Sequence, residues 1–196
     1  MKAGLLFGTF DPPHHAHVAV AGHMLRTQGL DAVWLVVTPL NPFKQHQPIS
    51  PDAHRLAMVK LAVQGHAGLE ACDFELGLPK PNYTADTLRA MRQRWPGHAF
   101  SLIIGSDNLQ AFHRWKEPEE ILAHHAVLVY PRPGAELHGS LSPFAGHPRV
   151  RLVTDAPVMD ISSTKLRELL GDGAPVDGLL DPAVAAYIGA HGLYRS

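Results

Sequence analysis

The sequence has little cysteine, no long apolar run and no charged run, and each shortage excludes a class of protein. Cys72 is the only cysteine among 196 residues, so neither an internal disulfide nor a zinc site of several cysteines can form. No apolar stretch approaches the ~18 residues that a membrane span needs, and the N-terminus lacks the apolar core of a signal peptide. Lys and Arg number 17 against 18 Asp and Glu, without the basic face of a nucleic-acid-binding domain. We therefore expect a cytoplasmic protein with no nucleic-acid or membrane partner.

The length and composition fit one globular unit. The chain is 45% hydrophobic and 18% charged, which is typical of folded soluble domains. Neither a repeat nor a long linker divides it. The sequence therefore predicts a single domain over residues 1–196, and it contains no signal for the oligomeric state.

Short apolar runs alternate with segments of helical periodicity along the chain. Strands are expected at 2–8, 31–39, 69–76, 99–107, 126–134 and 149–157. Helices are expected at 15–29, 50–65, 84–97, 117–125, 162–173 and 181–192. Ser50 and Thr84 are the expected N-caps of two of these helices. The alternation predicts an α/β protein with a doubly wound, mostly parallel sheet and helices on both faces, in which ligands bind at the carboxyl ends of the strands.

The stretch GTFDPPHHAH, residues 8–17, follows the first expected strand. Gly8 permits a close approach of the backbone, and two prolines stiffen the turn. His14 and His17 are three apart, so they share one face of the first helical turn, where free N–H groups favour anions. This combination indicates a phosphate site. An irregular turn with partly exposed histidines is the alternative, while a zinc site lacks a nearby cysteine and an HExxH pattern.

Two signatures in the chain resemble those of a known superfamily. GTFDPPHHAH is similar to the first signature of the nucleotidyltransferases with a (His/Thr)-x-Gly-His motif, and ISSTKLR at 161–167 is similar to their second. Between and after them, PLNPFK, NYTADTL, IIGSDNL, FHRWKEPEEI and YIGAHGLY resemble the bacterial nicotinate-nucleotide adenylyltransferases. The resemblance covers nearly the whole chain. Ala16 departs from it, because the motif has glycine there, and we expect the loop or the nucleotide to shift.

The resemblance implies a Rossmann-like nucleotidyltransferase fold and a reaction. An adenylyl group would pass from ATP to nicotinate mononucleotide, giving deamido-NAD and pyrophosphate in NAD biosynthesis. Mg²⁺ is the expected cofactor, carried by the ATP phosphates with no protein ligand. ATP and nicotinate mononucleotide are the expected partners.

The same resemblance implies roles for residues that follow the expected strands. His14 and His17 are expected to be catalytic, with His17 on the α-phosphate, while His15 points elsewhere. The expected ATP-binding residues are Gly8, Thr9, Phe10, His14, His17, Gly105, Asp107, Ile161, Ser162, Ser163, Thr164 and Arg167. The expected residues for nicotinate mononucleotide are Lys44, Tyr83, Thr84, Trp115 and Lys116.

Several of these residues also have a purely structural interpretation. One of the three hydroxyl residues at 162–164 is expected to cap a helix. Asp107 could likewise cap a helix, Lys44 could be solvated, and Trp115 could be a core residue. Trp34 and Trp95 are left to the core or the surface.

Two other functions remain open at this point. A pantetheine-phosphate adenylyltransferase would share both signatures but should lack YTADTL and the tryptophan after GSDN. A catalytically silent nucleotide sensor is the alternative that Ala16 suggests. A dehydrogenase is disfavoured, because no G-x-G-x-x-G follows the first strand.

Overall fold

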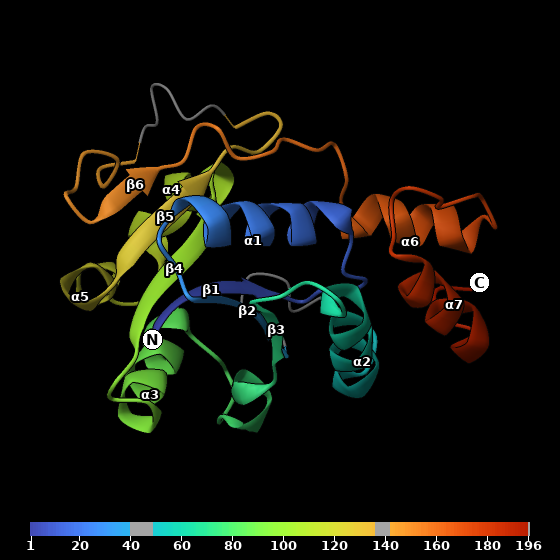
Figure 1. Ribbon diagram of the computed structural model, residues 1–196, viewed down its shortest axis with the longest axis horizontal. Helices are drawn as coiled ribbons and strands as arrows, with labels where there is room; N and C mark the ends of the chain where they lie inside the picture. Colours follow the sequence, from blue (N-terminus) through green and yellow to red (C-terminus); the bar gives the residue numbers. More distant parts are fainter. Residues whose placement is uncertain (40–48, 136–141, 196) are drawn as a thin grey trace.

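The computed structural model describes residues 1–39, 49–135 and 142–195. A six-stranded sheet runs in the order β3-β2-β1-β4-β5-β6, and every neighbouring pair is parallel (Figure 1). The strands are β1 (Lys2–Gly8), β2 (Ala32–Val37), β3 (Leu69–Cys72), β4 (Ala99–Gly105), β5 (Ala126–Tyr130) and β6 (Val150–Leu152). The strand order reverses between β1 and β4, which makes their carboxyl ends the switch point where ligands bind in such sheets. The predicted parallel, doubly wound fold is confirmed.

The α-helices lie on both faces of this sheet and beyond one end of it. They are α1 (His15–Thr27), α2 (Asp52–Val63), α3 (Thr84–Arg94), α4 (Ser106–Ala111), α5 (Pro118–His124), α6 (Ser163–Gly171) and α7 (Pro182–His191). Helices α1 and α2 pack on one face, and α3, α4 and α5 pack on the other. Helices α6 and α7 pack on α2, and Figure 1 shows α6 beside the start of α1.

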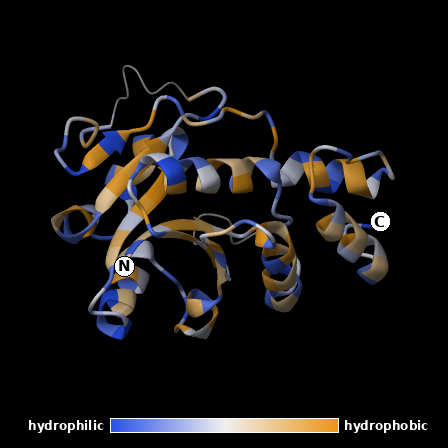
Figure 2. Cartoon of the chain, viewed as in Figure 1, coloured by the Kyte–Doolittle hydropathy of each residue, from blue (hydrophilic) through white to orange (hydrophobic). Residues whose placement is uncertain are grey.

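The two faces are separated by the alternation of side chains along each strand. In β1, Leu5 packs with α3 and α5 while Leu6 packs with α1 and α2. Every residue of β2 is buried, as a central strand of a parallel sheet requires when helices cover both of its faces. Figure 2 shows the strands as mostly hydrophobic and the outer helices as mixed. The periodicity of the sequence thus explains how the layers form.

Glycine at position 4 lets β1 pack closely within the sheet. A Cβ atom at Gly4 would lie 2.8 Å from the side chains of both Ile103 and Leu30. That distance is shorter than any van der Waals contact between carbons. The close packing of β1 therefore depends on the missing side chain.

The expected strand over 69–76 is wrong beyond Cys72. The chain turns instead into a short 3-10 helix, η2 (Phe74–Gly77), which buries the side chain of Glu75. Thr87 Oγ1 donates a hydrogen bond of 2.6 Å to Glu75 Oε1. The polar residue Glu75 in this segment is therefore buried and hydrogen-bonded, and it does not mark the solvent-facing side of a strand.

Both expected helix caps are also wrong by one residue. Pro51 is the N-cap of α2, and the backbone of Ser50 bonds elsewhere: its N–H donates to Asp11 Oδ2 and its carbonyl accepts from Arg55 Nε. Tyr83 is the N-cap of α3, and Thr84 is the first helical residue. In both cases the residue with the side-chain hydroxyl lies one position away from the residue that has the N-cap backbone conformation.

Some expected strands are longer than those observed. The fifth ends at Tyr130 and the sixth covers only Val150–Leu152. The fourth ends at Gly105, because α4 begins at the next residue. Within the described part of the chain, no helix is both long and apolar enough to cross a membrane.

Candidate active site

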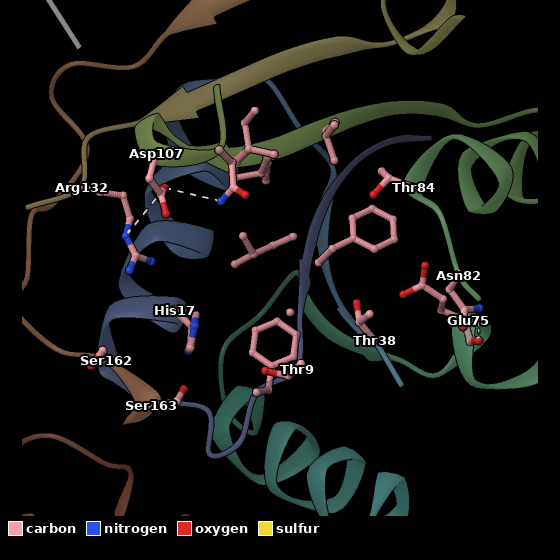
Figure 3. A pocket seen from close by; sticks show the side chains of 18 of the residues that line it. Thr9, His17, Thr38, Glu75, Asn82, Thr84, Asp107, Arg132, Ser162 and Ser163 are labelled. Atoms are coloured by element: carbon pink, nitrogen blue, oxygen red, sulfur yellow. Dashed lines mark hydrogen bonds and ion pairs between the residues drawn. The ribbon is translucent and has the colours of Figure 1, made fainter. Parts of the chain in front are cut away.

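A cavity of about 440 Å³ lies at the carboxyl ends of the central strands (Figure 3). Both sequence signatures and the middle segments contribute to its walls. The expected site residues that line it are Gly8, Thr9, Phe10, His14, His17, Tyr83, Thr84, Asp107, Trp115, Lys116, Ser162, Ser163, Thr164 and Arg167. Residues spread over 160 positions of sequence are therefore gathered in one place, as the switch-point rule predicts.

Two of the expected site residues, Gly105 and Ile161, are not among those that line the cavity. Gly105 is the N-cap of α4 and lies between the lining residues Ile104 and Asp107. Ile161 packs on the cluster formed by α2, α6 and α7. Lys44 lies outside the described residues.

The histidine turn, residues 11–17, leads from β1 into α1. His14 is the N-cap of α1, and its backbone N–H donates to His17 Nδ1 at 3.2 Å. The two imidazole rings stack with centroids 3.7 Å apart, and the edge of Phe10 meets His17 at 4.9 Å. His15 turns away and donates from Nδ1 to Gly178 O at 2.9 Å. Because Nδ1 of His17 accepts a hydrogen bond, its ring proton sits on Nε2, which is free to donate.

Both histidines are neutral at physiological pH. Burial, reinforced by the charge of Arg132 and by His15, lowers the pKa of His14 to about 4. Burial also holds the pKa of His17 well below its usual value, with His14 and Arg132 adding to the effect. The rings therefore act as hydrogen-bond donors and not as fixed cations.

Arg132 is a cavity residue that the sequence prediction missed. It follows β5 and lines the cavity, with its Nε 4.0 Å from Asp107 Oδ1. A Cβ atom at Gly105 would lie 2.7 Å from Arg132 Cγ, so this glycine makes room for the arginine stem. The signal was present in the sequence, because Arg132 follows a strand just as the other site residues do.

The second signature lies against the histidine turn. Ser162 caps α6 by accepting from the backbone N–H of Lys165 at 3.2 Å, which confirms that one hydroxyl of the three is a cap. Ser163 Oγ donates to Pro12 O at 2.8 Å. Arg167 donates from Nη2 to Thr164 Oγ1 at 3.4 Å. The N-terminus of α6, with its free backbone N–H groups, therefore reaches the same cavity as the start of α1.

Arg55 is a fully buried cation that holds the strand ends at this cavity. Its Nη1 donates to the carbonyl oxygens of Thr9 at 2.6 Å and Thr38 at 2.7 Å, and Nη2 forms an ion pair with Asp52. A planar guanidinium satisfies several acceptors at once. The loop after β1 and the end of β2 are thus fixed by one side chain.

The other end of the cavity is built from α3 and the segment after η3 (Phe112–Arg114). Trp115 packs against Phe112 with ring centroids 5.2 Å apart. Lys116 Nζ donates to Asp86 Oδ2 at 2.8 Å and lies 5.1 Å from the ring centroid of Tyr83. Lys116 therefore fastens the Trp115 segment to the start of α3.

The ion pair between Lys116 and Asp86 is part of a chain of exposed ion pairs. Arg89 contacts Asp86 at 2.9 Å and Glu117 at 2.5 Å, and all four charged side chains are between 39% and 45% exposed. Asp86 and Arg89 were not anticipated from the sequence, because helical spacing alone does not reveal a contact with the segment at 115–117.

Two buried polar residues, Glu75 and Asn82, complete this end of the cavity (Figure 3). Burial raises the pKa of Glu75, against the hydrogen bonds from Thr87 and Thr38. Asn82 Nδ2 donates to Glu75 O at 3.2 Å. Glu75 Oε2 and Asn82 Oδ1 have no hydrogen-bond partner among the described residues.

The fold and the cavity together define the class of protein. The strand order is that of a mononucleotide-binding sheet, and two helix N-termini with a pair of histidines meet at its switch point. These features are those of a Rossmann-like nucleotidyltransferase fold.

Comparison with known proteins narrows the class to a family. Residues 5–169 match the cytidylyltransferase-like family. A relative from Flavobacterium johnsoniae, named a probable nicotinate-nucleotide adenylyltransferase, is 40% identical over 195 residues and covers 100% of both chains. One of the same name from Bacteroides fragilis is 44% identical over 183 residues, covering 93% of this chain and 89% of its own. The chain belongs to the family of nicotinate-nucleotide adenylyltransferases, within the cytidylyltransferase-like proteins.

Solved structures agree with the fold. A nicotinic acid mononucleotide adenylyltransferase of Plasmodium falciparum, complexed with NaAD, matches with a TM-score of 0.80 at 18% identity, over 98% of this chain and 97% of that chain. The same enzyme complexed with APC matches with a TM-score of 0.78. At this identity, the likeness concerns the architecture.

Proposed function

We propose that this protein transfers the adenylyl group of ATP to nicotinate mononucleotide, releasing pyrophosphate and forming deamido-NAD. The observation that carries the proposal is the single cavity whose one end holds His17, Arg132 and the start of α6, and whose other end holds Thr84 and Trp115. Two phosphorylated substrates can meet between these ends. The names of the family members support the same reaction.

The chemistry is an in-line displacement at phosphorus. A phosphate oxygen of the mononucleotide forms a bond to the α-phosphorus of ATP, while the bond from that phosphorus to the bridging oxygen breaks and pyrophosphate leaves. Such a reaction needs positioning and charge stabilisation rather than a covalent enzyme intermediate.

The histidine turn supplies donors for the α-phosphate. The Nε2–H of His17 is free, since its Nδ1 accepts from the backbone of His14. It would donate to an α-phosphate oxygen as charge develops there, with His14 beside it. Arg132 and the backbone N–H groups at the start of α6 would take the β and γ phosphates.

The nucleoside part of ATP would lie along the ends of β1 and β4. Gly8, Thr9 and Phe10 supply backbone along one wall of the cavity. Asp107 would accept hydrogen bonds from the ribose hydroxyls, as acidic residues do in related sheets. Because Asp107 lies 4.0 Å from Arg132 Nε, the ribose would then lie beside the triphosphate.

The acid substrate would be recognised at the start of α3. Thr84 is the first residue of that helix, so its backbone N–H is free to bind the nicotinate carboxylate. Trp115 would stack on the pyridine ring, with Tyr83 and Lys116 closing the site.

Mg²⁺ would neutralise part of the phosphate charge, carried by the phosphates themselves. Within residues 1–39, 49–135 and 142–195, no group of three or more His, Cys, Asp or Glu is arranged to hold a metal. Of the two carboxyl groups named in the cavity wall, that of Asp107 faces Arg132 and that of Glu75 accepts a hydrogen bond from Thr87. These donors fit an ion that keeps water and phosphate ligands and takes little from the protein. We place the reaction in the cytoplasm, since the lone Cys72 needs no oxidising compartment.

The test is pyrophosphate release from ATP and Mg²⁺ with nicotinate mononucleotide, nicotinamide mononucleotide and 4′-phosphopantetheine in parallel. We expect the nicotinate compound to give by far the fastest release. Release with phosphopantetheine alone would keep the fold and overturn the substrate. Silence with all three, while ATP still binds, would favour a sensor and make Ala16→Gly the first change to make.

A further inference from the structure

The histidine turn is bonded by residues from the C-terminal part of the chain. Tyr194 Oη donates to Asp11 Oδ1 at 2.6 Å, across 183 positions of sequence. Arg167 Nη1 donates to Asp11 O at 2.8 Å, and Ser163 Oγ donates to Pro12 O at 2.8 Å. The Asp11 side chain and the carbonyl oxygens of Asp11 and Pro12 thus have partners in α6 or in the last residues.

The same part of the chain also holds the start of α1. The backbone N–H of His15 donates to Leu179 O at 3.1 Å, and the His15 ring donates to Gly178 O. The segment that joins α6 to α7 therefore fixes His15 on the side away from the stacked pair. His15 serves as an anchor, while His14 and His17 face the cavity.

Asp11 is the centre of this arrangement. Its side chain is 1% exposed, and both carboxylate oxygens accept hydrogen bonds, Oδ1 from Tyr194 and Oδ2 from the backbone N–H of Ser50 at 3.2 Å. The preceding residue is Phe10, whose ring edge contacts His17. A displacement of Asp11 would therefore move the ring against which His17 packs.

Tyr194 is held in a conformation that only its surroundings can maintain. Its φ of 64° lies in the left-handed region, which residues other than glycine rarely adopt. Its ring packs on the apolar cluster of α2, α6 and α7. Burial and the bond to Asp11 raise the pKa of Tyr194, so its hydroxyl stays protonated and donates.

We propose that Tyr194 is a positioning residue for the reaction: by donating to the buried Asp11 carboxylate, it holds the histidine turn so that His17 faces the α-phosphate. Tyr194 touches no substrate and acts through Asp11. The inference rests on the proposed function, because the geometry that it maintains matters only for phosphate transfer.

The experiment compares Tyr194→Phe with Tyr187→Phe in steady-state pyrophosphate release. Tyr187 is the matched control, because its hydroxyl also has a hydrogen-bond partner near the C-terminus, His54 Nδ1 at 2.9 Å. We expect Y194F to lower kcat about tenfold, as a lost bond to a buried charge and a small displacement of a reacting group would do. KM for nicotinate mononucleotide should stay within about twofold, and Y187F should keep the wild-type kcat.

A double-mutant cycle tests whether Tyr194 acts through Asp11. In an Asp11→Ala background, Y194F should lower kcat by less than about twofold, because the acceptor of the Tyr194 hydroxyl is already gone. A full tenfold loss in that background would overturn the proposal. So would a wild-type kcat in Y194F, or an equal loss in Y187F, which would indicate general loosening of the C-terminal helix.

A readout without turnover separates this inference from the proposed function. The ring Cε1–H signals of His14 and His17 in NMR spectra should shift in Y194F and D11A but not in Y187F. If the unchanged protein releases no pyrophosphate, the proposed function fails and these signals alone decide the inference. Unmoved signals in Y194F would refute it whatever the activity.

Discussion

The two ends of the cavity are held together by different kinds of interaction. At the proposed phosphate end, the histidine turn is fixed by hydrogen bonds to groups that are buried or partly buried, among them Asp11 at 1% exposure. At the proposed mononucleotide end, Lys116 and Asp86 are each 40% exposed and pair in contact with solvent. The hydrogen bonds that hold the first end are buried, whereas the ion pairs that hold the second end lie at the surface.

This difference has consequences for strength and for response to salt. A buried hydrogen bond to a charged group is strong and is screened little by ions. An exposed ion pair contributes about 0–1 kcal/mol and weakens as salt rises. The phosphate end should therefore be rigid under all ordinary conditions, while the mononucleotide end should loosen in salt.

The largest effect should come from removing the donor at the phosphate end. In His17→Ala we expect kcat to fall on the order of 10²- to 10³-fold, because one well-aimed donor is lost where charge develops. His66→Ala is the control, since His66 is exposed and lies just before β3, at the edge of the sheet opposite to the cavity. Steady-state pyrophosphate release measures both variants. A wild-type kcat in H17A would remove His17 from the mechanism.

The next effect concerns the acid stability of the buried histidine pair. The pKa of His14 is about 4 in the folded protein against an ordinary 6.5, so between these values the unfolded chain binds a proton that the folded one does not. Stability should therefore fall as pH drops from 6.5 towards 4, by about 2–3 kcal/mol from His14 alone at pH 4.5. Urea unfolding at pH 7 and 4.5 should show a correspondingly smaller fall in His14→Gln. An identical fall in both proteins would contradict a buried neutral His14.

At the mononucleotide end, Trp115→Ala should raise KM for nicotinate mononucleotide about 10- to 100-fold, in line with ~1–3 kcal/mol for stacking of an aromatic side chain on a base. KM for ATP should change by less than about twofold. Trp115→Phe retains an aromatic ring and should recover most of the loss. Equal increases in KM for both substrates would show that Trp115 has a packing role against Phe112 and does not stack on the pyridine ring.

The smallest effect is expected at the exposed ion pairs. Asp86→Asn should raise KM for nicotinate mononucleotide about two- to fivefold at low salt, and the difference from wild type should vanish near 1 M salt. Glu70→Gln is the control, since Glu70 is an exposed carboxylate on β3 at the sheet edge. An effect of D86N on KM that does not change with salt would mean that exposed ion pairs do not hold the mononucleotide end.

Local sequence patterns predicted the layers and the position of the site. Continuous apolar runs in β1 and β2 predicted a sheet covered on both faces. Short motifs after the strands then located the cavity, because parallel strands bring their carboxyl ends to one edge. The predictions were wrong where contacts between side chains far apart in sequence determine the local structure. The segment at Glu75 forms η2, in which the carboxyl group bonds Thr87.

By itself, the sequence determined the doubly wound fold, the family and the two signatures that line the cavity, since each rests on residues close together in the chain. Only the tertiary structure decided that His14 and His17 are stacked and neutral, that Arg132 faces them, and that Tyr194 reaches Asp11. The physical reason is that burial and long-range hydrogen bonds depend on which surfaces meet when the chain folds. No pattern of neighbouring residues in the sequence predicts these contacts.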